Sequence, residues 1–142
     1  MIYITDKKIY IEEFHKELSD NSCGAVVTFE GRVRNHHEDK QVVKLYYECY
    51  CDMAEKIMEK IKGETFDKFN IKQISMIHRV GNIPVGELAV WIGIASEHRG
   101  EAFIACKHVI DQIKTKVPIW KKETYSDESL SWTDCCHTEL KV

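Results

Sequence analysis

Hydrophobic residues recur along this chain with two different periods, which predict strands in some stretches and helices in others. Every second residue is apolar or small between residues 24 and 33, the pattern of a strand with one buried face. Its expected buried positions are Ala25, Val27, Phe29, Gly31 and Val33. Residues 87–96, ELAVWIGIAS, are apolar on both faces, which indicates a central strand covered on both sides. Four more strands are predicted at residues 1–4, 42–50, 70–81 and 119–125, the last being the final strand.

Three segments carry apolar residues three and four positions apart, the spacing of an amphipathic helix. They span residues 10–18, about 52–66 and about 100–117, and Pro118 ends the third. Their expected buried stripes are Ile11, Phe14 and Leu18, then Met53, Ile57, Met58 and Ile61, then Phe103, Cys106, Ile110, Ile113 and Val117. Residues 34–41, RNHHEDKQ, are an expected polar loop. We therefore expect one α+β domain spanning residues 1–142, with a single mixed sheet and helices packed on it.

Composition changes this picture little but excludes some classes of protein. The chain has 142 residues, enough for one domain with a full core, and its formal net charge is −3. A nucleic-acid binder would be basic overall, so we expect no nucleic-acid partner, although a local basic pocket for a small anion remains open. The start, MIYITDKK, does not resemble a signal peptide, and no apolar run reaches the length of a membrane span. We expect a cytosolic protein that does not enter a membrane.

The six cysteines are Cys23, Cys49, Cys51, Cys106, Cys135 and Cys136. Their C-x-C and C-C spacings differ from the C-x₂-C pairs of structural zinc sites. In a reducing cytosol we expect free thiols, with zinc or a redox pair at Cys135 and Cys136 as the alternative. We expect no metal and no cofactor.

Candidate chemistry lies in four polar clusters: residues 31–37, residues 96–100, Lys114 with Lys116, and residues 121–123. No H-E-x-x-H, G-x-S-x-G or P-loop pattern occurs. The scattered histidines, such as His15, His78 and His108, are expected to be structural or on the surface.

The first two clusters carry groups that suit an anion. Arg32 and Arg34 share a strand face, where two guanidinium groups suit a phosphate or carboxylate. Ser96 is the expected N-cap of the third helix, with His98 and Arg99 adding donors, and Arg99 is expected to face the sheet or a cleft. The alternatives are a charged solvent face for the arginines and a capped helix with surface charges.

The other two clusters are lysines on either side of Pro118. Lys114 lies at the edge of the third helix's apolar stripe, so its stem can pack while its amine reaches out. Lys121 shares one face of an alternating strand with Ile119 and Glu123, whereas Lys122 takes the other face. A lysine in an apolar setting is suited to proton exchange. A helix-end lysine and a solvated edge strand are the alternatives.

The motifs GAVVTFEGRVRNHH, IHRVGNIPVGE, SEHRGEAF and KTKVPIWKKE, in this order, resemble the MoaE family, the large catalytic subunits of molybdopterin synthase. The resemblance covers about residues 24–132, and the pattern K-T-x-x-P-x-W-K-x-E is its most specific part. It implies an α/β hammerhead fold. The tail TDCCHTELKV matches nothing in the family pattern, and the loop HHEDKQ looks variable.

The resemblance also implies an activity and partners. The expected enzyme is a sulfurtransferase that converts a cyclic pyranopterin monophosphate (precursor Z) to molybdopterin. Its sulfur donor is the thiocarboxylated C-terminal Gly-Gly of a small ubiquitin-like, MoaD-type partner. The expected assembly is a homodimer that binds two carriers as a heterotetramer. The alternative is a non-catalytic anion-binding or regulatory subunit of the same fold.

The motifs transfer roles to individual residues. Lys114 and Lys121 become the expected catalytic residues, and which of them moves protons, neutralises charge or binds covalently stays open. The expected substrate-binding residues are Arg32, Val33, Arg34, His98, Arg99, Lys114, Lys121, Lys122 and Glu123.

Overall fold

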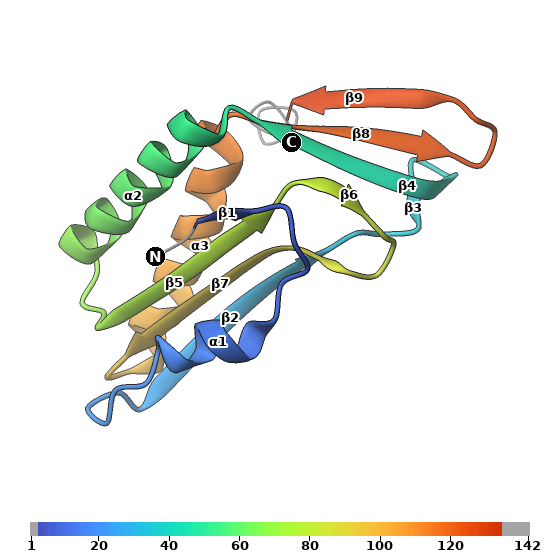
Figure 1. The fold of residues 1–142 in the computed structure, drawn as a ribbon. Coiled ribbons are helices and arrows are strands. Elements are labelled where there is room, and N and C mark those ends of the chain that lie inside the picture. The colour runs from blue at the N-terminus through green and yellow to red at the C-terminus, as the bar shows by residue number, and fades with distance from the viewer. Residues whose placement is uncertain (1–2, 135–142) are drawn as a thin grey trace.

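Between residues 3 and 134, the part of the chain that the computed structural model describes, strands assemble into two separate sheets. The first sheet has the order β1 (Ile4–Thr5), β5 (Gln73–Arg79), β7 (Leu88–Ser96), β2 (Ala25–Arg32). The second sheet has the order β3 (His36–His37), β4 (Lys40–Cys49), β8 (Ile119–Tyr125), β9 (Leu130–Asp134), with β6 (Gly81–Ile83) also paired to β4. Figure 1 shows both sheets with their labels.

The α+β class is confirmed, but the single expected sheet is divided in two. The first sheet is mixed, because β1 runs parallel to β5 while the other pairs are antiparallel. The predicted strand at residues 70–81 breaks at Gly81, whose positive φ of 89° turns the chain from the first sheet into the second. The expected loop at residues 34–41 contains a tight hairpin, in which Glu38 and Asp39 both have positive φ and β3 pairs with β4. These two turns explain why the strands do not form one sheet.

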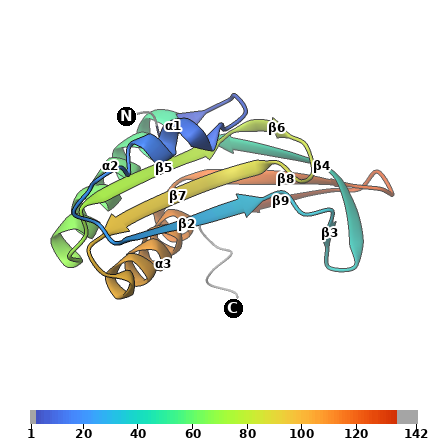
Figure 2. The same ribbon diagram turned by 90° about the horizontal axis from the view of Figure 1, so that it is seen from below.

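Helices cover the first sheet on both faces. Helix α3 (Arg99–Lys116) packs on β2 and β7, and α2 (Cys51–Lys68) packs on α3 and β1. Helix α1 (Ile11–Lys16) packs against β5 and β7 on the opposite face, as Figure 2 shows. Residues 89–96 of β7 are therefore all buried, which confirms the predicted central strand. The alternating burial of β2 is also confirmed.

The faces that the two long helices bury differ from the predicted stripes. Phe103 is 61% exposed and Met53 is 57% exposed, although both were expected in the core. The buried residues are instead Ala54, Met58, Ile61 and Thr65 in α2, and Ala102, Ala105, Cys106, Val109 and Ile113 in α3. Alanines let the helices approach each other and the sheet closely, so the contact face follows the small residues rather than the largest ones.

The strand at residues 119–125 is confirmed, but it is not the last, because β9 follows it. The connecting turn is held by Asp127, whose carboxylate accepts a hydrogen bond from the Ser129 amide at 2.9 Å, and Glu128 has a φ of 67°.

None of the helices between residues 3 and 134 combines the length and apolar character that crossing a bilayer requires.

The expectation of free thiols is wrong for one pair of cysteines. Cys49 and Cys51 form a disulfide where β4 passes into α2, because the intervening residue leaves their Cα atoms only 5.1 Å apart. Cys23 and Cys106 are free, and burial raises the pKa of the Cys106 thiol to about 11. Cys135 and Cys136 lie outside the described residues.

Candidate functional site

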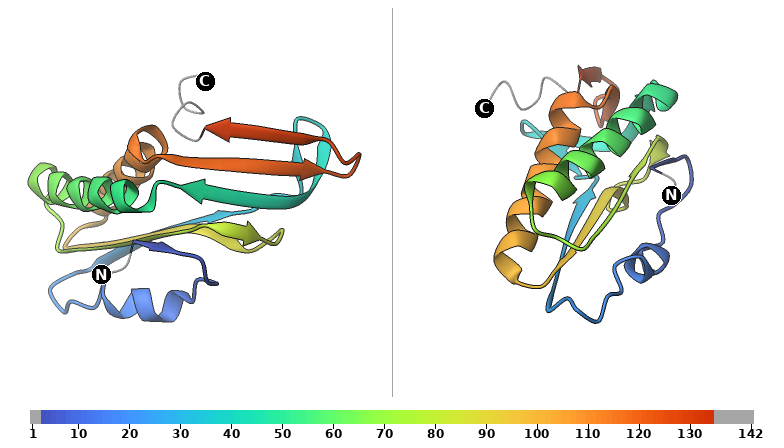
Figure 3. Two further views of the ribbon diagram at one scale, coloured as in Figure 1. Left: turned by 45° about the horizontal axis from the view of Figure 1, so that its top comes forward. Right: turned by 90° about the vertical axis from the view of Figure 1, so that its left-hand side faces the viewer.

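A sharp corner separates the two lysines that the sequence singles out. Helix α3 ends at Lys116, Val117 is already extended (φ −82°, ψ 127°), and Pro118 leads into β8. The predicted helix end is thus confirmed. We call residues 114–121 the lysine corner. The left panel of Figure 3 shows α3 passing directly into β8 where the helices give way to the second sheet.

Lys121 faces the interior side of the second sheet. Ile119 and Glu123 are buried on this face and Lys121 is half-buried between them, which confirms the predicted alternation. Lys121 Nζ lies 3.6 Å from Glu123 Oε1, and the two side chains are 18% and 5% exposed. That oxygen is buried and has no hydrogen bond in the part of the chain described. This Glu123 oxygen can therefore accept a hydrogen bond from a ligand or a water molecule.

A narrow cavity of about 50 Å³ opens beside this ion pair. Three chain segments line it: the end of β2 with the residues just after it, the inner face of β4, and β8. Its lining residues are Arg32, Val33, Arg34, His36, Val42, Leu45, Tyr47, Lys121 and Glu123. A wider hollow of about 460 Å³ beside α1 contains none of the predicted site residues. The small cavity is the better candidate because it gathers the cations that an anionic substrate needs.

The two arginines at the rim are held differently. Arg32 donates to the carbonyl oxygen of Gly86 at 2.9 Å and pairs with Glu30 at 2.7 Å. Arg34 is exposed, with one guanidinium nitrogen 3.5 Å from His37 Nδ1. Val33 between them is buried, so the backbone is anchored while both guanidinium groups remain at the surface. The structure brings these three predicted residues to the cavity that contains Lys121.

Lys122 lies on the opposite face of the second sheet. Its Nζ is 5.5 Å from the ring centroid of Tyr46 and 5.4 Å from that of Trp132. A lysine held between two aromatic rings gains cation–π stabilisation. Within this chain, Lys122 therefore does not line the cavity that Lys121 lines.

His98 and Arg99 are distant from the lysine corner. They stand at the start of α3, and fifteen residues of helix carry the chain about 22 Å from Arg99 to Lys114. The expected N-cap is wrong: Ser96 belongs to β7 and donates to the carbonyl oxygen of His98 at 2.5 Å, and His98 is the N-cap. Arg99 is exposed rather than turned toward the sheet. One chain alone does not bring these two residues to the cavity.

A buried histidine, expected from the sequence only to be structural or on the surface, contacts Tyr47, one of the residues that line the cavity. His78 is 2% exposed, and its ring meets the Tyr47 ring edge-on with centroids 5.0 Å apart. Tyr47 is in turn the cross-strand neighbour of Lys121. Burial, together with the positive charge of Lys114, lowers the pKa of His78 to about 4, so the imidazole is neutral at neutral pH. These contacts join residues distant in sequence, and no local pattern reveals them.

Metal binding has no support in the described residues. No group of three or more histidine, cysteine, aspartate or glutamate side chains between residues 3 and 134 is arranged to hold an ion.

Comparison with known proteins places this geometry in a family. The family model described as MoaE protein matches residues 4–116, which includes Lys114 but ends before Lys121. The catalytic subunit of molybdopterin synthase from Bos taurus is 39% identical over 93% of this chain and 70% of its own length. The protein of that name from Dictyostelium discoideum is 42% identical over 96% of this chain and 89% of its own length.

Solved structures of molybdopterin synthase subunits share the fold of this chain. The crystal structure of molybdopterin synthase from Staphylococcus aureus superposes with a TM-score of 0.88 at 35% identity, covering 93% of this chain and 96% of that one. A complex of subunits 1 and 2 of the molybdopterin-converting factor from Helicobacter pylori shares the fold, with a TM-score of 0.75 at 20% identity over 93% of this chain and 89% of that one. The chain therefore belongs to the MoaE family, and its relatives from Bos taurus and Dictyostelium discoideum are catalytic subunits of molybdopterin synthase.

Proposed function

We propose that this chain is a sulfurtransferase that converts a cyclic pyranopterin monophosphate to molybdopterin, with a carrier thiocarboxylate as the sulfur donor. Two anions must meet in such a reaction, the substrate phosphate and the thiocarboxylate. The observation that supports this proposal most directly is the small cavity, which Lys121, two arginines and one buried carboxylate line together. Grouped cations offset the repulsion between two anions and hold them close enough to react.

The reaction is proposed to proceed by two additions of sulfur. The thiocarboxylate sulfur forms a bond to one side-chain carbon of the pterin, and the cyclic phosphate ester opens as its carbon–oxygen bond breaks. Water then hydrolyses the acyl–sulfur bond, which frees the carrier with an ordinary carboxylate and leaves the sulfur on the pterin. A second charged carrier forms a carbon–sulfur bond at the adjacent carbon, whose own oxygen leaves as water, and hydrolysis of this second acyl–sulfur bond frees the second carrier.

Lys114 and Lys121 are the proposed catalytic residues. Lys121 is half-buried and lies 3.6 Å from a carboxylate oxygen of Glu123, which can orient the amine toward the cavity. Lys114 lies in the last turn of α3, on the other side of Pro118, and is not among the residues that line the cavity. We propose that one amine moves protons between the pterin carbons and water while the other neutralises phosphate charge. Arg32, Val33 and Arg34 are proposed to bind the substrate phosphate at the cavity rim.

The proposed sulfur donor is a small ubiquitin-like protein that ends in Gly-Gly. The Helicobacter pylori complex contains two subunits, which supports a two-protein assembly for this chain as well. The cavity holds only about 50 Å³ and so admits an extended glycine tail better than residues with larger side chains. We propose that this reaction takes place in the cytosol.

His98 and Arg99 can contribute to this site only from a second copy of the chain. About 22 Å of helix separates Arg99 from Lys114, far more than the reach of an arginine side chain. We therefore propose a homodimer in which the start of α3 in one protomer faces the lysine corner of its partner, with one carrier bound at each site. Lys122 lies on the outer face of the second sheet, and we propose that it contacts the partner protomer or the carrier rather than the substrate.

The test is turnover with defined components. Purified chain, thiocarboxylated carrier and the cyclic pterin monophosphate should yield a dithiolene product, detected by mass spectrometry after alkylation. The rival function, a non-catalytic anion-binding subunit, predicts binding of the pterin phosphate without product. Binding without turnover at saturating carrier would therefore contradict the proposed function.

A further inference from the structure

The motif IHRVGNIPVGE spans residues 77–87, and none of its residues has a role in the proposed reaction. It forms the end of β5, the whole of β6 and the turn that leads into β7. Two charged side chains near its ends form an ion pair, with Arg79 Nη1 2.8 Å from Glu87 Oε1. The two ends of the motif are therefore joined by a charged contact.

This ion pair is largely buried, yet one of its polar atoms is left without a partner. The Arg79 side chain is 11% exposed and the Glu87 side chain 29% exposed. Arg79 Nη2 lies 3.5 Å from the carbonyl oxygen of Asn82, whereas the buried Nε has no hydrogen-bond partner among residues 3–134. Apolar residues of similar size often stabilise such a position equally well, because burying two charges costs free energy. Stability alone therefore explains the pair poorly, and a fixed geometry between two chain segments is the other property that it supplies.

Two backbone hydrogen bonds connect this pair to the residue that follows Arg32. The Val33 amide donates to the carbonyl oxygen of Glu87 at 3.0 Å, and the Gly86 amide donates to the carbonyl oxygen of Val33 at 2.8 Å. Gly86 has a φ of 90°, a conformation that suits glycine and few other residues. The register between β2 and β7 shifts between Gly31 and Arg32, so these two bonds fix the chain just where the sheet pairing becomes irregular.

The same turn also orients the Arg32 side chain. Arg32 Nη1 donates to the carbonyl oxygen of Gly86 at 2.9 Å, and Nη2 pairs with Glu30 at 2.7 Å. The Arg32 side chain is 56% exposed, so these contacts rather than tight packing set the direction of its guanidinium group. A continuous series of contacts thus runs from Arg79 through Glu87 and Gly86 to Arg32.

We propose that Arg79 and Glu87 are positioning residues for Arg32, whose guanidinium group they hold at the cavity rim through the backbone of residues 86–87. This role rests on the proposed function, in which Arg32 binds the substrate phosphate. Neither Arg79 nor Glu87 lines the small cavity, so both act through Arg32 and touch no substrate. Loss of the pair should weaken binding of the cyclic pterin monophosphate and leave the lysines in place.

The double variant Arg79→Met/Glu87→Gln removes both charges and keeps side chains of similar length. We expect its Kd and KM for the cyclic pterin monophosphate to rise about 10-fold, with kcat and the KM for the carrier within about twofold of wild type. Glu87→Gln alone leaves the Arg79 charge buried and unpaired, so it should unfold at a lower urea concentration than the double variant. A double variant with wild-type Kd and KM would overturn the positioning role.

An exposed ion pair supplies the matched control. Lys60→Met/Glu64→Gln makes the corresponding neutral changes in α2, where the two side chains are 75% and 46% exposed. This variant should bind the pterin phosphate and turn over like wild type. An equal loss of binding in the control would overturn the role, because the effect would then not belong to residues 79 and 87.

A second background tests whether the effect passes through Arg32. Arg32→Ala should raise the Kd by itself, and adding Arg79→Met/Glu87→Gln should raise it by less than about twofold more, because the positioned group is already gone. A further rise of about 10-fold would overturn the role, since independent losses add. The Kd is measured without carrier. A wild-type chain that binds the pterin phosphate without turnover would therefore contradict the proposed function alone, whereas one that does not bind it would overturn both proposals.

Discussion

At the scale of single residues, the candidate site contains a buried charge with one charged partner. Glu123 is 4% exposed, and Lys121 Nζ is the cation 3.6 Å from its Oε1. Removing one member of a buried ion pair leaves the other uncompensated, and this costs stability. A lysine variant at this site therefore needs controls that separate lost stability from lost chemistry.

The first prediction concerns both lysines. Lys114→Ala should lower turnover by about 10²–10⁴-fold, the usual effect of losing an acid–base group, and change the free energy of unfolding by less than about 1 kcal/mol. Lys121→Ala should be as slow and should also lose about 1–3 kcal/mol, because Glu123 is left buried without its cation. Steady-state kinetics and urea unfolding measure the two effects.

Controls are available for each lysine. Lys116→Ala changes an exposed lysine about 200° round the helix from Lys114 and should turn over like wild type. The double variant Lys121→Ala/Glu123→Gln removes the uncompensated carboxylate, so it should regain stability without regaining turnover. If turnover returned with stability, Lys121 would be a structural partner of Glu123 and not a catalytic residue.

The second prediction concerns the pH dependence of stability. The pKa of His78 is lowered from 6.5 to about 4 by burial, so between these values the unfolded chain binds a proton that the folded chain does not. Stability is therefore lost as pH falls through this window, by up to about 3 kcal/mol. His78→Phe should lose about 2 kcal/mol less than wild type between pH 7 and 4.5 in urea titrations. Equal losses in the two proteins would show that His78 is not buried as a neutral base.

Sequence could identify some of these residues and not others, for a physical reason. The period of a strand places Ile119, Lys121 and Glu123 on one face whatever the rest of the fold does, so this part was predictable. His78 was not, because its contacts with Tyr47 and its proximity to Lys114 arise only when β5, β4 and α3 meet.

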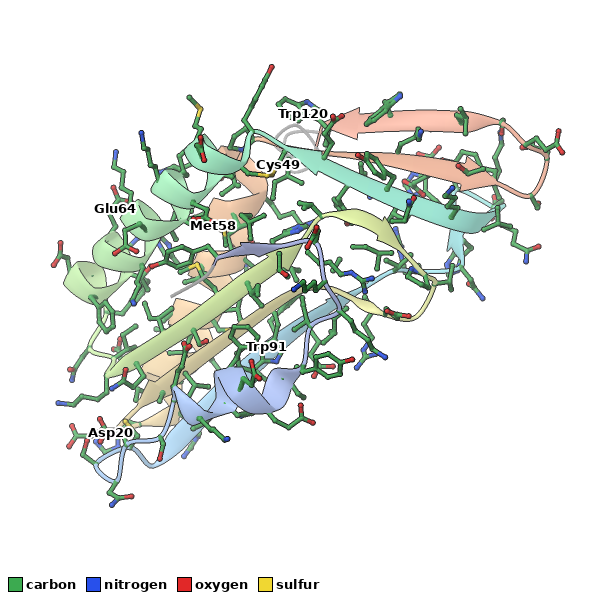
Figure 4. The ribbon with its side chains drawn as sticks, in the orientation of Figure 1. Asp20, Cys49, Met58, Glu64, Trp91 and Trp120 are labelled. Atoms are coloured by element: carbon green, nitrogen blue, oxygen red, sulfur yellow. A yellow bond between two sulfur atoms is a disulfide. The ribbon has the colours of Figure 1, made fainter. Side chains whose placement is uncertain are left out.

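At the scale of elements, the corner between β4 and α2 supports the lysine corner. The Cys49–Cys51 disulfide closes it, and the amide of Tyr50 donates to the carbonyl oxygen of Pro118 at 3.3 Å. The Tyr50 ring also meets Trp120 edge-on, with centroids 5.2 Å apart. Figure 4 labels Cys49 and Trp120 on the neighbouring strands β4 and β8. The turn at Pro118 is thus tied to a second turn.

The third prediction is that this disulfide is a minor support and no part of the chemistry. A loop of three residues gains only about 1–2 kcal/mol from closure, so Cys49→Ser/Cys51→Ser should lose no more than that in unfolding free energy. Turnover should stay within about twofold of wild type, because sulfur is supplied by the carrier. Cys23→Ser, at a free half-buried thiol, is the control. A double variant that folds but no longer transfers sulfur would contradict the external source of sulfur.

Elements were easier to predict than their contact faces. Alternation and helical spacing found most strands and all three helices, since backbone geometry fixes those periods. The stripes of α2 and α3 were misplaced because alanines pack at the closest contacts, leaving Met53 and Phe103 in solvent. The division into two sheets depends on turns at Gly81 and residues 38–39, which local hydrophobic patterns do not reveal.

At the scale of the whole molecule, the predicted site residues other than Lys122 fall into two groups near opposite ends of α3. One group surrounds the cavity near Lys121, and the other is His98 with Arg99. In the proposed site these groups are two half-sites, and about 22 Å of helix separates Arg99 from Lys114 within one protomer. A homodimer can combine one half from each protomer into a complete site.

The fourth prediction uses this division. Arg99→Ala and Lys121→Ala should each be nearly inactive alone, but a mixture reassembled from both should regain about a quarter of the wild-type rate. Half of randomly paired dimers are mixed, and each mixed dimer keeps one intact site of two. A mixture of Lys114→Ala with Lys121→Ala is the control and should stay inactive, because both changes fall in the same half-site. Absence of recovery in the first mixture would mean that Arg99 serves no shared site.

The most direct test of the account follows the sulfur itself. The carrier is charged with a heavy sulfur isotope in its thiocarboxylate, the chain is left unlabelled, and the pterin product is weighed after alkylation of its dithiolene. We expect both dithiolene sulfurs to carry the label, with two carriers consumed for each product and no label left on the cysteines of the chain. Unlabelled product, label retained on Cys49 or Cys51, or no product from wild-type chain with saturating carrier and pterin would contradict sulfur transfer from a carrier at the lysine corner.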